Sequence, residues 1–291
     1  MAKVSFLGLG VMGYPMAGHL LKKGGHDVTV YNRTAAKSTQ WAEEYGGRNA
    51  PTPRKAAGDC DLVLMCVGND DDIRSVVYGA DGALEGMKEG GILVDHTTAS
   101  AIIARELDAA CKERGMGFID APVSGGQAGA INGQLGIMCG GDEATFAKAK
   151  PVLDLYAKMC ALIGPAGSGQ LTKMVNQIAI AGLMQGLSEA INFGKRAGLD
   201  IERVIGVISK GAAQSWQMEN RWQAMDDLKF DGYGFAVDWM RKDLGICLEE
   251  ANKTGARLPA TALIDQFYAQ VQARGGSRWD TCSLMHLLAK D

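Results

Sequence analysis

The chain has 291 residues, of which 47% are hydrophobic and 22% are charged, and this ordinary globular composition excludes wholesale disorder. The formal net charge of −3, from 30 basic and 33 acidic residues, argues against a generally basic nucleic-acid binder. Glycine is the outlier, because its 39 residues fall in short clusters between apolar runs, which indicates many tight turns. The length predicts two domains, since a domain usually has about 100–200 residues.

The first half of the chain alternates between short apolar segments and helical patterns. Strands are predicted over residues 3–7, 27–31, 61–67, 91–94, 117–119 and 135–139. Helices are predicted over residues 11–23, 35–45, 70–78, 99–114 and 143–156. Strands and helices that alternate at these lengths are typical of an α/β fold, in which helices cover both faces of a parallel sheet.

The pattern changes after residue 164. A helical pattern without proline runs from residue 169 to about residue 196, and at about 1.5 Å per residue this helix would be roughly 40 Å long, enough to span two domains. Further helices are predicted over residues 201–210, 219–227, 236–254, 260–273 and 281–289. We therefore predict an α/β domain over residues 1–163 and an all-α domain over residues 164–291.

The sequence shows no sign of a leader, a membrane span or a metal site. The chain begins directly on an apolar segment, without the charged region and cleavage site of a signal peptide. The longest uncharged run, residues 121–141, is too rich in glycine for a membrane helix. The 7 cysteines are scattered without CxxC spacing, and the 4 histidines show no ligand spacing. We expect a cytoplasmic protein without disulfides, metal, membrane or nucleic-acid partner.

A glycine-rich loop connects the first predicted strand to the first predicted helix. The loop reads Gly8-Leu9-Gly10-Val11-Met12-Gly13. Alone this G-x-G-x-x-G pattern is weak, but the strand before it and the helix after it are the setting of a dinucleotide-binding loop. Gly8 would allow the tight turn, Gly10 the close approach of a pyrophosphate, and Gly13 the close packing of helix against strand. The start of the helix would offer free N–H groups to the phosphates.

The residues after the second predicted strand bear on the choice of cofactor. NAD-binding proteins usually carry Asp or Glu about 20 residues beyond the loop, where the carboxylate binds the ribose hydroxyls. This chain instead has Asn32, Arg33 and Thr34. Arg33 could bind a 2′-phosphate, and its two neighbours could add neutral hydrogen bonds. We favour NADP(H); the alternative is that Arg33 is a solvated loop charge and that the protein accepts both NADP and NAD.

Four motifs in chain order resemble the signatures of the β-hydroxyacid dehydrogenases. They are residues 8–17 (GLGVMGYPMA), 120–126 (DAPVSGG), 169–176 (GQLTKMVN) and 242–245 (KDLG). Together they extend over nearly the whole chain, and their combination is specific. The resemblance implies a Rossmann dinucleotide-binding domain joined by a long helix to an all-α domain, with the active site in the cleft. It also implies the reversible oxidation of a 3-hydroxy acid, or the reduction of the matching semialdehyde or keto acid.

The same resemblance implies roles for single residues. Lys173 would be the catalytic residue, Asn176 its helper, and Lys242 would lie near the nicotinamide. The residues that would contact the substrate are Thr98, Ser124, Gly125, Gly126, Lys173, Phe235 and Asp243. The chain departs from the family at His19, where Asn is frequent, and at residues 279–281 (WDT), where an Asp-aromatic-Ser pattern is frequent.

The chemistry of Lys173 and Asn176 fits this reaction. Reduction of a carbonyl leaves negative charge on its oxygen, and an ammonium within hydrogen-bond reach both stabilises that charge and donates the proton. Lys173 is expected to start as the acid, because a lysine is ordinarily protonated at neutral pH. Asn176 lies three residues later and shares the same helix face, where an amide can orient the lysine or the substrate without competing for the proton.

Other candidates lie where the predicted strands end, the edge at which open α/β sheets bind ligands. Val67 and Gly68 could border the nicotinamide ribose. Thr98 could contact cofactor and substrate, or it could be a helix N-cap. The turn at residues 124–126 could hold a substrate carboxylate through one hydroxyl and backbone N–H groups, or it could be a turn without a ligand. The acidic run at residues 69–72 is interpreted as the capped start of a helix rather than a cation site.

Several functions compete at this point. A 6-phosphogluconate dehydrogenase looks similar at residues 32–34 and 124–126, but it is much longer and carries His-Asn where this chain has Val175-Asn176. Imine reductases usually replace the lysine that this chain keeps as Lys173. We predict an NADP(H)-preferring reductase of small carboxylate-bearing aldehydes or keto acids, such as glyoxylate or succinic semialdehyde, that forms a homodimer or homotetramer. The alternatives are an NAD-linked 3-hydroxyisobutyrate-type dehydrogenase and a non-catalytic cofactor-binding scaffold.

Overall fold

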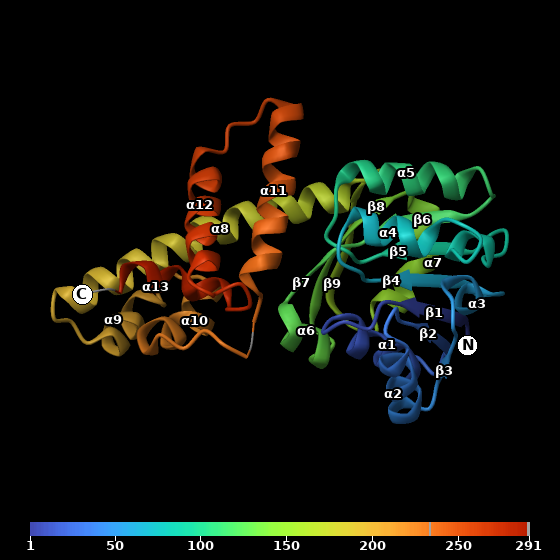
Figure 1. Ribbon diagram of the computed structural model, residues 1–291, viewed down its shortest axis with the longest axis horizontal. Helices are drawn as coiled ribbons and strands as arrows, with labels where there is room; N and C mark the ends of the chain where they lie inside the picture. Colours follow the sequence, from blue (N-terminus) through green and yellow to red (C-terminus); the bar gives the residue numbers. More distant parts are fainter. Residues whose placement is uncertain (233, 290–291) are drawn as a thin grey trace. The chain divides into compact units, whose positions relative to one another are not determined.

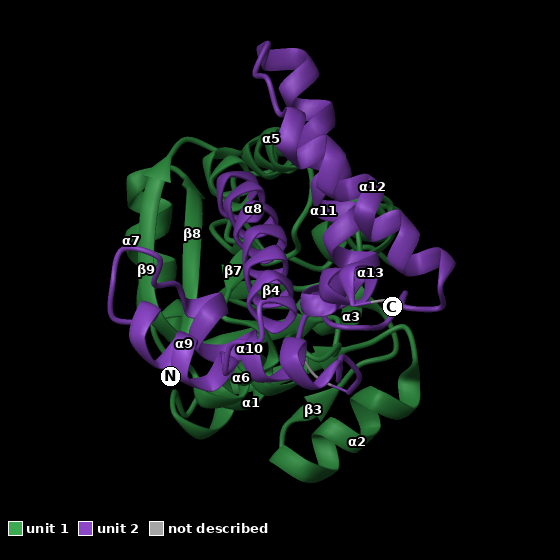
Figure 2. Cartoon of the chain, turned by 90° about the vertical axis from the view of Figure 1, so that its left-hand side faces the viewer, with its two compact units in different colours: residues 1–173 green, residues 174–291 purple. Residues whose placement is uncertain are grey.

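A computed structural model of the chain describes residues 1–232 and 234–289. The chain forms two compact units, Met1–Lys173 and Met174–Asp291, hereafter unit 1 and unit 2 (Figure 2). The division falls inside one helix, α8 (Ser168–Arg196). The predicted domain boundary, between residues 163 and 164, lies at the end of the preceding strand, β9 (Ala157–Gly164).

Unit 1 is built on a nine-stranded sheet with the order β3-β2-β1-β4-β5-β6-β8-β7, in which β9 pairs with β8 (Figure 1). The strands are β1 (Lys3–Leu7), β2 (Asp27–Tyr31), β3 (Arg48–Asn49), β4 (Leu62–Met65), β5 (Ile92–Asp95), β6 (Gly117–Asp120), β7 (Val123–Ser124), β8 (Leu135–Gly141) and β9. The strands from β1 to β6 are paired in parallel, which confirms the predicted α/β class. Parallel pairing brings the carboxyl ends of β1, β2, β4, β5 and β6 to one edge of the sheet.

Helices connect these strands. They are α1 (Gly13–Lys22), α2 (Ala35–Tyr45), α3 (Pro53–Ala57), α4 (Asp70–Val77), α5 (Ala101–Lys112), α6 (Gly126–Asn132) and α7 (Glu143–Leu153), with the 3-10 helix η1 (Ala83–Glu85). The Asn69 side chain caps α4 by accepting a hydrogen bond from the backbone N–H of Asp72 at 2.8 Å. The acidic run at residues 69–72 is therefore a capped helix start, as predicted.

One end of the sheet differs from the prediction of an all-parallel arrangement. The strand predicted at residues 135–139 forms as β8, but β8 runs antiparallel to both β6 and β7. The reason lies in the connection, because residues 125–134 are too few for the crossover that a parallel pair of strands requires. The strand β9 was not predicted. Buried and exposed residues do not alternate regularly along β9, and its apolar residues Met159 and Ile163 are exposed.

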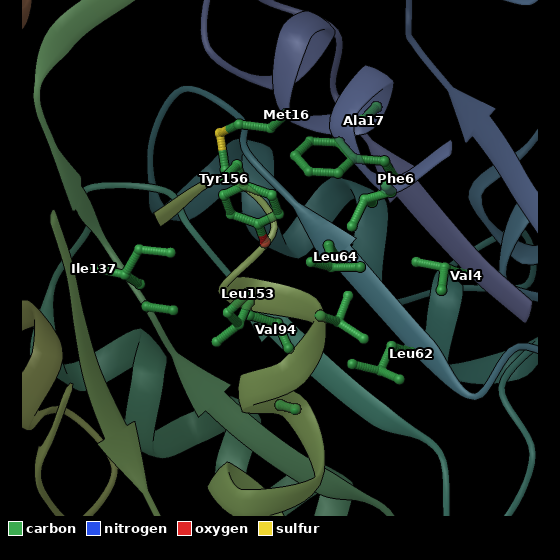
Figure 3. Close-up of a cluster of buried hydrophobic side chains, with 14 of the residues drawn as sticks. Val4, Phe6, Met16, Ala17, Leu62, Leu64, Val94, Ile137, Leu153 and Tyr156 are labelled. Atoms are coloured by element: carbon green, nitrogen blue, oxygen red, sulfur yellow. The ribbon is translucent and has the colours of Figure 1, made fainter. Parts of the chain in front are cut away.

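The two faces of the sheet carry separate apolar clusters, because successive residues of a strand point to opposite faces. Val4 and Phe6 belong to one cluster, and Leu7 belongs to the other. Figure 3 shows the first cluster, in which Phe6 and Met16 lie beside the fully buried ring of Tyr156. Burial of this sheet on both faces fixes the positions of the strand ends, where the candidate site residues lie.

Unit 2 is helical in its described residues. After α8 come α9 (Ile201–Ile208), α10 (Trp216–Asp227), α11 (Val237–Thr254), α12 (Pro259–Ala273), the 3-10 helix η2 (Thr281–Leu284) and α13 (Met285–Leu288). Met184, Met240, Leu244 and Tyr268 are fully buried in its core. The predicted all-α second part is thus confirmed. Across the described ranges, no helix has the length and apolar character needed to cross a lipid bilayer.

Candidate active site

The glycine-rich loop lies between β1 and α1, and two of its glycines are required by the backbone. Gly8 has φ +96°, a conformation that L side chains rarely adopt, and a Cβ at this position would collide with the carbonyl oxygen of Cys66. A Cβ at Gly13 would collide with the carbonyl oxygen of Gly8. Gly10 differs, because a Cβ there would meet no heavy atom within 4 Å. The loop is therefore tightly packed at Gly8 and Gly13, whereas space remains next to Gly10.

We expect Gly13→Ala and Gly10→Ala to separate folding from binding. Gly13→Ala should lower the free energy of unfolding by about 1–3 kcal/mol, because the added methyl group overpacks the loop. Gly10→Ala should unfold like the wild type but bind dinucleotide about tenfold more weakly, since the methyl group occupies the open space. Urea unfolding and NADPH titration measure the two effects. Equal losses of stability in both variants would contradict this assignment.

The start of α1 fits a phosphate group. Met12, at the N-cap position, provides no side-chain hydrogen bond to the helix, whereas Asn69, Ser100 and Asp142 cap α4, α5 and α7. The N-cap residue of α1 therefore leaves the first N–H groups of this helix without a side-chain cap of its own. Together with the space above Gly10, this end of α1 is compatible with the predicted binding of a pyrophosphate, which remains a prediction.

Asn32 connects this loop to the end of β2. Its Oδ1 accepts a hydrogen bond from the backbone N–H of Leu9 at 2.9 Å, and its Nδ2 donates to the carbonyl of Thr34 at 3.0 Å. The backbone N–H of Gly8 also donates to the carbonyl of Tyr31 at 2.9 Å. The bonds of Leu9 and Gly8 join the glycine-rich loop to the end of β2, and the bond to Thr34 fixes the orientation of the Asn32 amide. The expected contact of Asn32 and Thr34 with the cofactor remains a prediction.

Arg33 and Val67 lie near the glycine-rich loop, at the ends of β2 and β4. The Arg33 side chain is 84% exposed, and its Nη1 lies 3.1 Å from Oδ1 of Asp72 in α4. Val67 lies after β4, and its backbone N–H donates to the Thr97 hydroxyl at 3.0 Å. A Cβ at Gly8 would come within 3.0 Å of the Val67 side chain, so the loop and the end of β4 lie side by side.

Thr98 lies after β5, in a segment that a buried glutamine holds at both sides. Gln170, in the first turn of α8, donates through Nε2 to the carbonyl of Thr97 at 2.7 Å. Its Oε1 accepts from the backbone N–H of Ala99 at 3.0 Å. Thr98 is not a helix N-cap, because Ser100 caps α5 and accepts from the backbone of that helix. The N-cap interpretation of Thr98 is therefore wrong.

The start of α8 is anchored to the end of β6. The buried carboxylate of Asp120 accepts hydrogen bonds from the backbone N–H groups of Gly167 at 2.8 Å and Gln170 at 2.9 Å. Lys173 follows one turn after Gln170, and its side chain is 6% exposed. Asn176 follows one turn later on the same helix. The anchored first turn of α8 therefore determines the position of Lys173 relative to the strand ends of unit 1.

The turn at residues 124–126 follows the short strand β7. Ser124 pairs with Gly136 of β8, and Gly125 and Gly126 have φ values of +129° and +61°. Both values lie in the region that favours glycine. The turn therefore requires glycine at both positions, and its expected contact with a substrate carboxylate remains a prediction.

In unit 2, a buried chain of polar contacts joins three of the predicted residues. Asn176 Nδ2 donates to Gln177 Oε1 at 2.8 Å, and Gln177 Nε2 donates to Asp243 Oδ2 at 2.7 Å. The Lys242 ammonium lies 3.3 Å from Asp243 Oδ1. Gln177 and Asp243 are each 2% exposed. Gln177 thus brings the amide of Asn176, on α8, together with Lys242 and Asp243, on α11.

Phe235 is held by a different carboxylate. Its backbone N–H donates to Asp280 Oδ2 at 2.8 Å, and Asp280 is fully buried. Arg221 lies 3.2 Å from the other oxygen of Asp280. This ion pair fixes the segment before α11, so Asp280, at the place where the chain departs from the family pattern, supports the backbone at Phe235.

These networks also contain residues that were not predicted, and two of them, Gln170 and Gln177, lie on α8. Each lies beside a predicted residue on α8, and the signal was available for Gln170, which precedes Lys173 by three residues and therefore shares its helix face. Nothing in the spacing indicates that Gln177 contacts Asp243, which is 66 residues away.

Comparison with known proteins follows the same division of the chain. Residues 3–164 match the model of the NAD-binding domain of 6-phosphogluconate dehydrogenase, and residues 167–288 match the NAD-binding model of NADP-dependent 3-hydroxyisobutyrate dehydrogenase. The chain belongs to the β-hydroxyacid dehydrogenase family. As a member of this family, it is an NAD(P)-dependent oxidoreductase of the hydroxyacid dehydrogenase type.

Relatives and solved structures match this family member over its whole length. An oxidoreductase of Shewanella frigidimarina is 62% identical over 290 residues, which cover 100% of this chain and 99% of the relative. The 2-hydroxy-3-oxopropionate reductase of Escherichia coli is 34% identical, with 98% and 97% covered. The structure of Mycobacterium tuberculosis 3-hydroxyisobutyrate dehydrogenase with L-serine superposes with a TM-score of 0.90 at 29% identity, and both chains are covered completely.

Proposed function

We propose that this family member is an NADP(H)-preferring reductase of small carboxylate-bearing aldehydes or keto acids, with Lys173 as general acid and base. The observation that carries the proposal is the environment of Lys173. Its helix begins on the Asp120 carboxylate, and Gln170 ties that beginning to the backbone on both sides of Thr98. A lysine on a helix turn that is anchored in this way can be positioned for proton transfer to a bound substrate.

The cofactor preference rests on the end of β2. The carboxylate that NAD-binding proteins place there for the ribose hydroxyls is replaced by Asn32, whose amide is bonded to Leu9 and Thr34. The next residue, Arg33, is exposed and carries a guanidinium that matches the geometry of a phosphate. These features support a 2′-phosphate at this position, and hence NADP(H).

The substrate class rests on the turn at residues 124–126 and on a relative. The Ser124 hydroxyl and the backbone N–H groups of Gly125 and Gly126 would hold a substrate carboxylate. The Escherichia coli relative is named for the reduction of 2-hydroxy-3-oxopropionate, a short carboxylate with an aldehyde group. Because one methylene changes binding by only about 1–3 kcal/mol, a group of related short substrates is expected.

The residues then divide the work of the reaction. The loop from Gly8 to Gly13, together with Arg33, would hold a dinucleotide, which would supply the hydride when bound. The Lys173 ammonium stabilises the negative charge that grows on the substrate oxygen and donates its proton to that oxygen. In the oxidative direction Lys173 accepts the proton from the hydroxyl group, so a higher pH favours oxidation. Asn176 keeps the lysine or the substrate oxygen in position.

A second candidate is an NAD-linked dehydrogenase of the 3-hydroxyisobutyrate type. One observation favours it, because Arg33 forms an ion pair with Asp72, and that pairing weakens the attraction of Arg33 for a 2′-phosphate. The structural similarity to the Mycobacterium tuberculosis 3-hydroxyisobutyrate dehydrogenase points in the same direction.

Initial rates with NADPH and with NADH test the proposal, measured across a panel of short semialdehydes and 2-keto acids. We expect faster turnover with NADPH at low cofactor concentration. Arg33→Ala should raise the KM for NADPH at least about tenfold and leave the KM for NADH unchanged. Arg48→Ala is the matched control, since Arg48 is also an exposed arginine paired with an aspartate, Asp27.

Each outcome of the panel separates the candidates. Better turnover with NADH, unaffected by Arg33→Ala, would favour the 3-hydroxyisobutyrate-type enzyme. Tight NADPH binding without turnover of any panel member would overturn the proposed reaction and favour a cofactor-binding scaffold.

A further inference from the structure

The three acidic residues at the start of α4 have three different partners. Asp70 accepts hydrogen bonds from the backbone and the hydroxyl of Ser100. Asp71 is 95% exposed and lies 3.7 Å from Arg74, on the next turn of its own helix. Asp72 instead reaches the end of β2, where its Oδ1 lies 3.1 Å from Nη1 of Arg33. Only the third of these carboxylates touches the residue proposed to bind the 2′-phosphate.

The position of Asp72 is held by its surroundings. Its backbone N–H is bonded to the cap residue Asn69, and its side chain is only 30% exposed. A Cβ at Gly68 would collide with Oδ2 of Asp72, so the carboxylate lies directly over the backbone after β4. The carboxylate is therefore the more enclosed partner of the pair, and the Arg33 side chain, at 84% exposed, is the more accessible one.

We propose that Asp72 is a specificity-determining residue that limits the preference of this chain for NADP(H), an inference that rests on the proposed binding of the 2′-phosphate by Arg33. A 2′-phosphate has to take the Arg33 guanidinium from the carboxylate, and it then lies close to a second negative charge. Both effects lower the affinity for a ligand that carries a 2′-phosphate, because like charges repel. They leave the affinity for a ligand with a free 2′-hydroxyl unaffected, since that group carries no charge. Arg33 thus attracts a 2′-phosphate, and Asp72 opposes its binding at the same ribose position.

Binding of 2′,5′-ADP and of 5′-AMP tests this proposal without any need for turnover. The two probes differ only in the 2′-phosphate, and calorimetric titrations at low ionic strength give a dissociation constant for each. Asp72→Asn keeps the size of the side chain and removes its charge. We expect this variant to bind 2′,5′-ADP about three- to tenfold more tightly, a gain comparable to the loss of one partly exposed ion pair and one charge repulsion. Its affinity for 5′-AMP should stay within about twofold of the wild type.

Asp71→Asn is the matched control. It removes the same charge from the same helix turn, one residue away, without touching Arg33. Its affinity for 2′,5′-ADP should stay within about twofold of the wild type, because an exposed and distant charge is screened by solvent. An equal gain in the two variants would show a general charge effect and overturn the proposal, as would an unchanged or weaker affinity of Asp72→Asn for 2′,5′-ADP.

The same titrations separate this proposal from the proposed function. Arg33→Ala should weaken binding of 2′,5′-ADP and leave that of 5′-AMP unchanged. If Arg33→Ala binds 2′,5′-ADP as tightly as the wild type, the proposed binding of the 2′-phosphate by Arg33 fails, and tighter binding by Asp72→Asn would then support only the repulsion between Asp72 and the phosphate. If Arg33→Ala binds 2′,5′-ADP more weakly and Asp72→Asn binds it like the wild type, the proposed function stands and the role of Asp72 fails.

Discussion

Lys173→Ala is expected to lower kcat for carbonyl reduction by about 10³-fold, because the variant would lose both the proposed proton donor and the positive charge that we propose to lie next to the substrate oxygen. The dissociation constant for NADPH should change by less than about threefold, since the lysine is proposed to act on the substrate. Stopped-flow turnover and a fluorescence titration with NADPH measure the two quantities. Added methylammonium should restore part of the rate in Lys173→Ala, which a purely structural role of the lysine would not explain.

Two further variants distinguish loss of catalysis from misfolding and from a general effect of removing a lysine. Lys173 is buried, so Lys173→Met keeps most of the apolar stem in place and should fold even if the alanine variant is unstable. Lys195→Ala is the control, because Lys195 lies near the other end of the same helix and pairs with Asp226. A wild-type rate in Lys173→Met would refute the proposed proton transfer.

Asp95→Asn is expected to remove a pH-dependent loss of stability from the protein. Asp95 is fully buried at the end of β5, where its Oδ1 accepts from the backbone N–H of Thr97 at 2.8 Å. Its Oδ2 has no hydrogen-bond partner within residues 1–232 and 234–289. Burial raises the pKa of Asp95 from 3.8 to about 7, hydrogen bonds from Thr97 oppose that rise, and the nearby charge of Asp120 adds to it.

The raised pKa of Asp95 makes the free energy of unfolding depend on pH. The folded chain binds a proton on Asp95 between about pH 4 and pH 7, where the unfolded chain has lost it. The free energy of unfolding therefore decreases as the pH rises through this range, by up to roughly 4 kcal/mol at about 1.36 kcal/mol per pKa unit. Asparagine cannot titrate, so the difference in stability between Asp95→Asn and the wild type should grow in favour of the variant from pH 5 to pH 8.

Urea unfolding of both proteins at several pH values measures this difference. Asp61→Asn is the control with the opposite sign, because the hydrogen bond from Lys88 lowers the pKa of Asp61. Asp61→Asn should therefore have a lower free energy of unfolding than the wild type at neutral pH, and this difference should disappear as the pH falls through the lowered pKa of Asp61. A constant difference between the wild type and Asp95→Asn from pH 5 to pH 8 would rule out the titration of Asp95.

The sheet shows which elements a sequence can predict. β4 is a continuous apolar segment that is buried on both faces, and β1 is buried from Val4 to Leu7, so composition indicates both strands. β3 consists of two exposed residues, Arg48 and Asn49, and no periodicity can develop over two positions. β7 is equally short. These strands exist because a neighbouring strand offers free backbone groups, which is a property of the assembled sheet.

The site shows the same distinction. The glycines of the phosphate loop could be predicted, because the backbone demands that make Gly8 and Gly13 necessary are local to a strand–turn–helix connection. The clamp of Gln170 on the backbone around Thr98 joins residues more than 70 positions apart, and a glutamine has no preferred partner that spacing alone could reveal. The ion pair of Arg33 with Asp72 likewise depends on how β2 and α4 are placed, and motif reading indicates only the arginine.

The two hydrogen bonds of the Asn32 side chain have a consequence for cofactor engineering. A common way to redirect such a fold toward NAD is to place a carboxylate after the second strand. At position 32 the carboxylate would still accept from Leu9, but its other oxygen would face the carbonyl of Thr34, to which the amide now donates. Two acceptors would then oppose each other beside the phosphate loop. Redesign is therefore better directed to positions 33 and 72, whose side chains pair with each other rather than with the glycine-rich loop of residues 8–13.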